Sequence, residues 1–388
     1  MSEDAGINQT DEGPSIYENW KAALRCESTQ STFEYPFFTD AHITGTITEG
    51  YGPYQFINTI ASSLHDTDST RPAIILRADV HLTFEPSMLR MEKTDDERYH
   101  GGYLQDEAAA LVSLCLGIRL KSGEMTRRWS EPQGDPKGYP CYYRFANEPV
   151  LLRSASGAII PRALGTHSLR NVTPLAALHN LLPKDAVILI RAARLYQDGL
   201  WIAESEPHLS WLMFVSALET VANHWRAGIE APTERLRASR PKLEEILKRY
   251  GGDDLLLEVA KEVAPYMGST KKFVDFGLAF LPDPPSVRPY EWAQHSWETK
   301  PIRTSLERIY DYRSKALHGG KPFPHPMCGP PVTVGDDRTL TEIPIGLAES
   351  ALGGTWLSDD TPMLLHTFEY IVRGGLLRWW QSLAIDKA

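Results

Sequence analysis

A stretch near the end of the sequence, residues 302–320, constrains the fold most strongly because its apolar residues recur at the spacing of an α-helix. The apolar positions are Ile302, Leu306, Ile309, Ala316 and Leu317. Side chains three and four residues apart share one face of a helix, and an apolar face is buried against a core. Pro301 suits the first turn, and Gly319 is predicted to cap the C-terminal end. The stretch therefore predicts one amphipathic helix.

An arginine interrupts this apolar stripe. At about 100° per residue, Arg313 falls between Ile309 and Leu317. A guanidinium in that position needs acceptors, because an unpaired buried charge is very costly. Glu219 lies in another apolar helical stretch and needs a partner for the same reason. We therefore expect Glu219 to orient Arg313 across the helical bundle.

A histidine follows the arginine by about a turn and a half of helix. His318 lies at the predicted C-terminus, where the helix dipole favours a positively charged imidazolium. Ser314 precedes His318 by four residues and shares a neighbouring face. An arginine can bind the non-bridging oxygens of a phosphodiester, and a histidine can transfer protons. The pattern indicates phosphodiester chemistry, but a helix cap and a structural ion pair are the commoner explanation for such a pair.

The residues around this pair resemble the R-x4-H signature of HEPN domains, in the Apea-like branch of that family. Residues 309–319 carry the resemblance, with tyrosine before the arginine and Gly319 after the histidine. Residues 211–219 resemble the preceding helix of the same branch, which ends in Ala-Leu-Glu. Many active members have Asn, Asp or His directly after the arginine, whereas this chain has Ser314. The two stretches together cover roughly the C-terminal half of the chain.

The resemblance implies a metal-independent endoribonuclease that needs no cofactor. His318 would act as general base or acid on the ribose 2′-hydroxyl, and Arg313 would stabilise the charge on the phosphate. Ser314 would hold a phosphate oxygen, with Glu219 and Tyr310 as supporting residues. Two such helices commonly face each other in this family, so a homodimer is implied. The implied context is anti-phage or stress defence, in which a toxin-like ribonuclease responds to a phage or host trigger.

The alternative is a non-catalytic HEPN-type module that binds RNA or a protein partner. In that case the arginine and the histidine would serve the packing of a dimer. Substituting both residues separates the alternatives, because an enzyme would lose RNA cleavage and a scaffold would lose assembly or nothing.

The net charge of −10 argues against nucleic-acid binding over the whole surface, but it allows a local basic groove. Basic residues gather at positions 226–249, where glutamates are interleaved with them. The candidate RNA-binding residues are Arg235, Arg237, Arg240, Lys242 and Lys315. The simpler interpretation of the cluster is a solvated helix with ion pairs four residues apart.

No metal site is predicted, because His318, His325 and Cys328 match no standard zinc spacing. The four cysteines are far apart, so we expect free thiols in a reducing cytoplasm. The polar, acidic start of the sequence does not resemble a signal peptide. The apolar run at 108–116 is too short to span a bilayer. We therefore expect a cytoplasmic protein without a membrane partner.

A chain of 388 residues is expected to form two domains. Residues 1–15 are predicted to be a flexible tail, and residues 16–170 an α+β domain that senses a trigger or sets specificity. Residues 175–388 are predicted to form an all-α helical bundle of the HEPN-like type, with a long loop insertion at 319–360. The predicted helices are 104–120, 185–203, 207–226, 232–250, 253–267, 269–281, 302–320 and 361–383, and the predicted strands are 41–48, 73–82, 332–334 and 340–343.

Overall fold

The computed structural model describes residues 12–59, 70–82, 94, 96–129, 137–141, 148–225, 231–263 and 267–385. The chain divides into two compact units. The first contains Met1–Arg153, Ile160–Ser205 and Trp379–Ala388, and the second contains Ser154–Ile159 and Glu206–Arg378. The first unit contains a sheet and the second is mostly helical, in the order that the sequence predicts. The main division lies near residue 205, about one long helix later than the predicted boundary.

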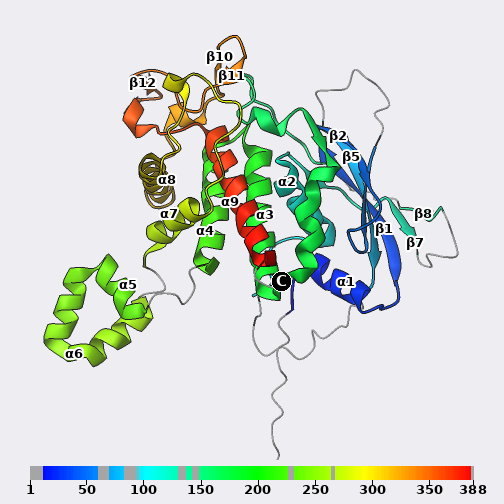
Figure 1. Cartoon of the computed structure of the whole chain (residues 1–388), viewed down its shortest axis with the longest axis horizontal. Helices are drawn as coiled ribbons and strands as arrows, with labels where there is room; N and C mark the ends of the chain where they lie inside the picture. Colours follow the sequence, from blue (N-terminus) through cyan, green and yellow to red (C-terminus); the bar gives the residue numbers. More distant parts are fainter. Residues whose placement is uncertain are drawn as a thin grey trace, which may run out of the picture. The chain divides into compact units, whose positions relative to one another are not determined.

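An antiparallel sheet forms one side of the first unit (Figure 1). Its strands run in the order β3-β4-β5-β1-β7-β8, and β6 also pairs with β1. The strands are β1 (Ser31–Thr39), β3 (Thr46–Ile47), β4 (Tyr54–Asn58), β5 (Arg71–Val80), β6 (Lys121–Ser122), β7 (Arg127–Trp129) and β8 (Tyr139–Pro140). Alternate residues of β5, Ile74, Leu76 and Ala78, are fully buried, as expected for a strand with one face on the core.

The predicted strand at 41–48 is divided in two. Strand β2 (His42–Thr44) pairs in parallel with β9 (Thr166–Ser168), whereas β3 joins the main sheet. Gly45 separates them with a φ of +82°, a backbone conformation that residues with a side chain rarely adopt. The glycine therefore lets one stretch of chain serve two sheets.

The helices of the first unit are α1 (Ser15–Leu24), α2 (Leu104–Leu116) and α3 (Pro183–Ile202), with a 3-10 segment η3 (Leu169–Asn180). Helix α2 contacts α1, α3 and η3, and its residues 107–116 are all buried. The buried carboxylate of Glu107 accepts hydrogen bonds from the backbone N–H groups of Ser15 (3.1 Å) and Ile16 (2.6 Å) at the start of α1. A carboxylate is stabilised there by the helix dipole. Of the predicted flexible tail, residues 1–11 lie outside the described residues, and Ser15 already belongs to α1.

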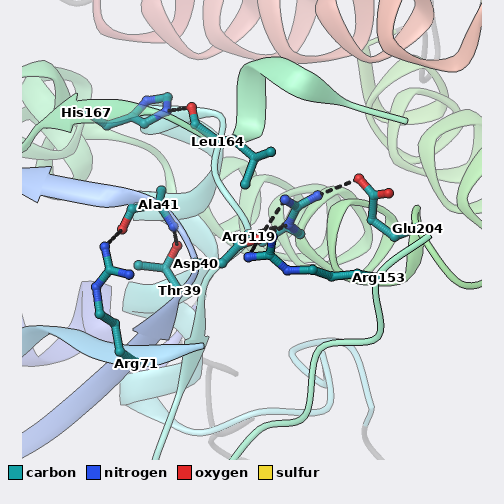
Figure 2. A network of polar contacts seen from close by, with 9 residues as sticks. All are labelled: Thr39, Asp40, Ala41, Arg71, Arg119, Arg153, Leu164, His167 and Glu204. Atoms are coloured by element: carbon teal, nitrogen blue, oxygen red, sulfur yellow. Dashed lines mark hydrogen bonds and ion pairs between the residues drawn. The ribbon is translucent and has the colours of Figure 1, made fainter. Parts of the chain in front are cut away.

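A buried group of charged side chains lies beside α2 (Figure 2). Arg119, which is 1% exposed, donates from Nη2 to Asp40 (2.7 Å) and from Nη1 to Glu204 (3.0 Å). The Nη2 group of Arg153 also contacts Asp40, at 3.3 Å. Helix α2 ends at Leu116 because Gly117 is left-handed, so the helix is four residues shorter than the predicted 104–120 and Arg119 lies beyond its end. The network therefore joins the ends of β1, α2 and α3.

The second unit consists of helices and a long insertion. Its helices are α4 (Pro207–Trp225), α5 (Pro232–Ser239), α6 (Pro241–Val263), α7 (Ser269–Ala279), α8 (Thr299–Gly319) and most of α9 (Leu365–Ile385). Helices α4, α7 and α8 pack together through fully buried side chains, among them Phe214, Phe276 and Leu306. The predicted stripe of α8 is therefore confirmed over its first part, from Ile302 to Ile309.

Helices α5 and α6 differ from the two helices predicted at 232–250 and 253–267. The break comes earlier, at Pro241, because proline lacks the N–H group that would continue α5. Helix α6 then runs past the paired glycines with a kink at Gly252, where φ is +69°. Helices α5 and α6 share a small core of Leu236, Leu256 and Ala260.

The insertion after α8 contains two hairpins. Strands β10 (Thr333–Val334) and β11 (Thr339–Leu340) form the predicted one, while β12 (Ala348–Ala351) and β13 (Gly354–Leu357) form a second that was not predicted. The insertion is held against α8 where the Tyr312 hydroxyl donates to the carbonyl of Asp360 at 2.6 Å. Within the described part of the chain, no helix has both the length and the apolar character needed to cross a membrane.

Candidate functional site

Helix α8 carries the predicted site residues in its last two turns. The helix ends at Gly319, and Gly320 is the left-handed cap with a φ of +62°. The N–H groups of Gly320 and Lys321 both donate to the carbonyl of Lys315. The cap is thus one residue later than predicted, which places His318 in the final helical turn.

Glu219 of α4 binds two residues of α8. Its Oε2 accepts from Nη2 of Arg313 at 2.6 Å, and its Oε1 accepts from the hydroxyl of Tyr310 at 2.6 Å. The side chains of Arg313 and Glu219 are 20% and 16% exposed. The guanidinium also lies over the Tyr310 ring, 5.4 Å from its centre. The predicted pairing of Glu219 with Arg313 is therefore confirmed, and the same carboxylate also fixes Tyr310.

The environment of Tyr310 keeps its hydroxyl protonated. The pKa of Tyr310 is raised to about 12, first by burial and then by the hydrogen bond and the charge of Glu219. The charge of Arg313 and a hydrogen bond with Ser269 of α7 act in the opposite direction. Tyr310 therefore acts as a hydrogen-bond donor to Glu219 over the physiological pH range.

Glu219→Gln is expected to lower the pKa of Tyr310 from about 12, because it removes the charge that opposes ionisation of the phenol. Loss of the partner of Arg313 should also lower the free energy of unfolding by about 1–3 kcal/mol. Ultraviolet titration of the tyrosines measures the pKa, and the difference from Tyr310→Phe isolates this one phenol. An unchanged titration and an unchanged stability would mean that Glu219 does not position these residues.

The raised pKa of Tyr310 also sets a pH window for stability. The folded state holds the neutral phenol more strongly than the unfolded state, whose pKa is near 10. This contribution is therefore complete below pH 10 and is lost as the pH rises towards 12. In Tyr310→Phe, the decline of stability with pH in this window should be shallower than in the wild type.

Arg313 keeps donors that the protein does not use. Within the described residues its one hydrogen bond is the bond from Nη2 to Glu219, and its buried Nε–H has no acceptor. A buried donor without an acceptor is rare in native proteins and calls for an explanation. Glu219 therefore holds the guanidinium in place but accepts only one of its N–H donors.

His318 and Leu317 are exposed at the end of α8, Leu317 to 51% of its surface. The predicted apolar stripe is wrong at Leu317, because the helix extends beyond the core that buries Ile309. Five residues correspond to about 140° around a helix axis, so Arg313 and His318 leave α8 in different directions. Ser314 is half-buried and lies about 40° from His318, one turn earlier.

The predicted RNA-binding residues are not all gathered together. Lys315 pairs with Asp311 at 2.6 Å, and Arg237 of α5 pairs with Glu244 of α6 at 2.9 Å, seven residues away. The simpler interpretation, ion pairs four residues apart, holds in α6, where Lys248 pairs with Glu244 at 2.9 Å. The hydrogen bonds from Lys248 and Arg237 lower the pKa of Glu244. Arg240 and Lys242 are exposed at the junction of α5 and α6, whereas Arg235 lines a pocket with residues of α7.

The residues considered as metal ligands do not form a cluster. Among the residues that the structure describes, no group of three or more His, Cys, Asp or Glu side chains is arranged to hold a metal ion. The thiol of Cys328 lies 3.3 Å from Nδ1 of His208, and His325 binds Glu349 at 2.9 Å. Burial raises the pKa of Cys328 to about 12, so this thiol stays protonated and unreactive.

Comparison of the chain with protein-family models, with curated proteins and with solved structures gives no significant match. Sequence reasoning missed Ser269, which contacts Tyr310, and the two lysines that follow it in α7. Adjacent lysines at the start of a helix were the signal present in the sequence, but nothing there linked them to Arg313.

Proposed function

We propose that the second unit is a metal-independent endoribonuclease with a HEPN-like helical bundle, in which Arg313 and His318 act on one phosphodiester. The observation that carries the proposal is the guanidinium of Arg313, which is 20% exposed and which Glu219 holds at 2.6 Å on the helix that ends with the exposed His318. The R-x4-H resemblance adds to it. A fixed cation and an exposed proton carrier are what cleavage of RNA by its own 2′-hydroxyl requires.

In the proposed reaction, His318 accepts the proton of a ribose 2′-hydroxyl. The 2′-oxygen then attacks the adjacent phosphorus, the bond from phosphorus to the 5′-oxygen breaks, and the leaving oxygen takes up a proton. The products are a 2′,3′-cyclic phosphate and a 5′-hydroxyl, with no net oxidation. Arg313 would stabilise the negative charge on the phosphate oxygens, and Ser314 would bind one of them. No step requires a metal or a cofactor.

A homodimer would complete this site. The angle of about 140° between Arg313 and His318 on one helix makes it difficult for both to reach the same phosphate from one chain. A second α8 across a two-fold axis would bring the His318 of one chain towards the Arg313 of the other. The exposed Leu317 supports this arrangement, because an apolar side chain between the two is suited to burial in an interface between identical helices.

Such an activity would need control, since an unrestrained ribonuclease damages its own cell. We propose that the first unit senses a phage or host trigger and that cleavage serves defence. The support is that the described residues of the first unit pair buried charges with one another, such as Arg119 with Asp40, and contain no group of three or more His, Cys, Asp or Glu side chains arranged to hold a metal ion.

The test is incubation of the purified full chain with RNA in the presence of EDTA. We expect cleavage that leaves a cyclic phosphate and a 5′-hydroxyl, which enzymatic end-labelling and mass spectrometry identify. A matched substrate with a single 2′-deoxy sugar at the cleavage site should resist, because it lacks the nucleophile. Absence of cleavage under every condition, or cleavage that EDTA abolishes, would contradict the proposal.

One observation favours a non-catalytic module instead. Arg313 packs between Glu219 and the ring of Tyr310, which is a structural role in itself. A module of this kind would bind RNA or a partner protein without cleaving it. The double variant Arg313→Ala, His318→Ala would then change assembly and not RNA integrity.

A further inference from the structure

A pocket lies between the end of α5 and the start of α7. Its lining includes Arg235 and Ser239 of α5 together with Gly268, Lys271, Lys272 and Asp275 at the α7 side. Its empty volume of about 390 Å³ includes space that is open to solvent, so it is an open hollow and not an enclosed cavity. A group that binds there would remain partly in contact with water.

The lining is strongly positive in a protein whose net charge is −10. Three of the named residues are cations, and one is an acid. That acid, Asp275, also faces Arg303, whose Nη1 lies 3.9 Å from its carboxylate. A concentration of positive charge in a concave site attracts anions. Here the positive charge occurs in a chain whose net charge is negative.

The backbone adds to this charge with the same sign. Gly268 precedes α7 in a left-handed conformation with a φ of +77°, and no side chain caps the helix. The first N–H groups of a helix are without intrahelical partners, and the helix dipole is positive there. This helix end alone would not define a site, but it lies beside the lysines and strengthens their effect.

Helices α4 and α7 link the pocket with the candidate active site. Ser269, which follows the lining residue Gly268, acts to lower the pKa of Tyr310 through a side-chain hydrogen bond, and Tyr310 shares Glu219 with Arg313. Lys272 donates from Nζ to Asn223 at 3.2 Å, and Asn223 lies one turn beyond Glu219 on α4. The pocket and Arg313 are therefore supported by the same parts of α4 and α7.

We propose that this pocket binds a phosphate group of the RNA strand and so positions the neighbouring nucleotides at Arg313 and His318. The inference rests on the proposed ribonuclease function, and it names where the protein holds the substrate outside the reacting bond. Lys271 and Lys272 are its main ligands, together with Arg235. Of the RNA-binding residues expected from the sequence, Arg235 is the one that lines this pocket.

The test measures binding of a 2′-O-methylated RNA, which cannot be cleaved, to the full chain with Lys271→Gln and Lys272→Gln. The affinity should fall at least about tenfold, because the variant lacks two charge-assisted hydrogen bonds to the phosphate. The slope of log affinity against log salt should decrease in magnitude by about 0.7, the value for one phosphate that the variant no longer neutralises. The matched control is Arg249→Gln with Lys261→Gln, which removes the same charge from α6 outside the pocket, and it should bind nearly as the wild type does.

The uncleavable RNA separates this inference from the ribonuclease proposal. If the wild type cleaves RNA but the lysine variant and the control bind equally well, the pocket assignment is wrong and the ribonuclease proposal stands. If the lysine variant alone loses RNA binding but the wild type does not cleave, the pocket assignment stands and the catalytic proposal falls. Competition by inorganic phosphate or a mononucleotide, without any binding of the RNA strand, would overturn the assignment to RNA.

Discussion

Replacing Arg119 with alanine is expected to lower the free energy of unfolding of the first unit by about 3–5 kcal/mol. Arg119 is 1% exposed and binds both Asp40 and Glu204, whose side chains are also buried. Truncation to alanine would leave two buried carboxylates without the cation that they share. Arg153 would still contact Asp40, at 3.3 Å. Hydrogen exchange of the amides in β1 and α2 measures the local free energy of opening, with urea unfolding as a second measurement.

The matched control is Arg25→Ala. Arg25 also binds a carboxylate, that of Glu27 at 2.7 Å, but the two side chains are 58% and 41% exposed. An exposed ion pair contributes about 0–1 kcal/mol, so this variant should remain close to the wild type. Equal losses of unfolding free energy in the two variants would mean that burial does not make the ion pairs of Arg119 more costly to break.

A further variant distinguishes the charge from the packing. Arg119→Met combined with Asp40→Asn and Glu204→Gln removes the three most buried charges of the network while keeping similar volumes, and it leaves Arg153, whose side chain is 37% exposed. Buried ion pairs can often be replaced by neutral groups with little loss, whereas breaking them is costly. The triple variant should therefore be more stable than Arg119→Ala, although it has more substitutions.

The parts of the fold that could be predicted are those whose local sequence agrees with their final environment. Helix α2 follows from a continuous apolar run, and β10–β11 follows from alternating residues around a turn. Helix α1 escaped prediction because its N-terminus is satisfied by Glu107, which lies far away in the sequence. Strands β12 and β13 are short and contain alanine, serine and glycine, which carry little strand preference.

The candidate site could be predicted where a charged residue was expected to be buried and therefore needed a partner of opposite charge. Arg313 on an apolar stripe and Glu219 in an apolar helix each required a partner, and the structure pairs them. Periodicity could not show where the core stops, so Leu317 was wrongly placed inside it. The proximity of α5 and α7 depends on the tertiary fold. For this reason the sequence could not predict that Arg235 lies in one pocket with Lys271 and Lys272.

His318→Ala is expected to reduce RNA cleavage by about 10²–10⁴-fold, the usual contribution of a positioned general acid or base. The fold should persist, because His318 is exposed and surface substitutions change stability by about 0.5 kcal/mol or less. The measurement is the initial rate of cleavage of a defined RNA in EDTA. His325→Ala is the matched control, since His325 is 46% exposed and lies in the insertion after α8. Equal rates in the two variants would remove His318 from the mechanism.

The same substitution can show whether the site is shared between two chains. A His318→Ala chain and an Arg313→Ala chain, each weakly active alone, would form a mixed dimer that keeps one intact His318 and one intact Arg313. If the two residues act across a two-fold axis, co-expression should restore cleavage well above the rate of either variant. If both residues act within one chain, every chain in the mixture is defective and no recovery follows. If cleavage never depends on either residue but the double variant fails to assemble, then the exposed end of α8 is a docking surface and not an active site.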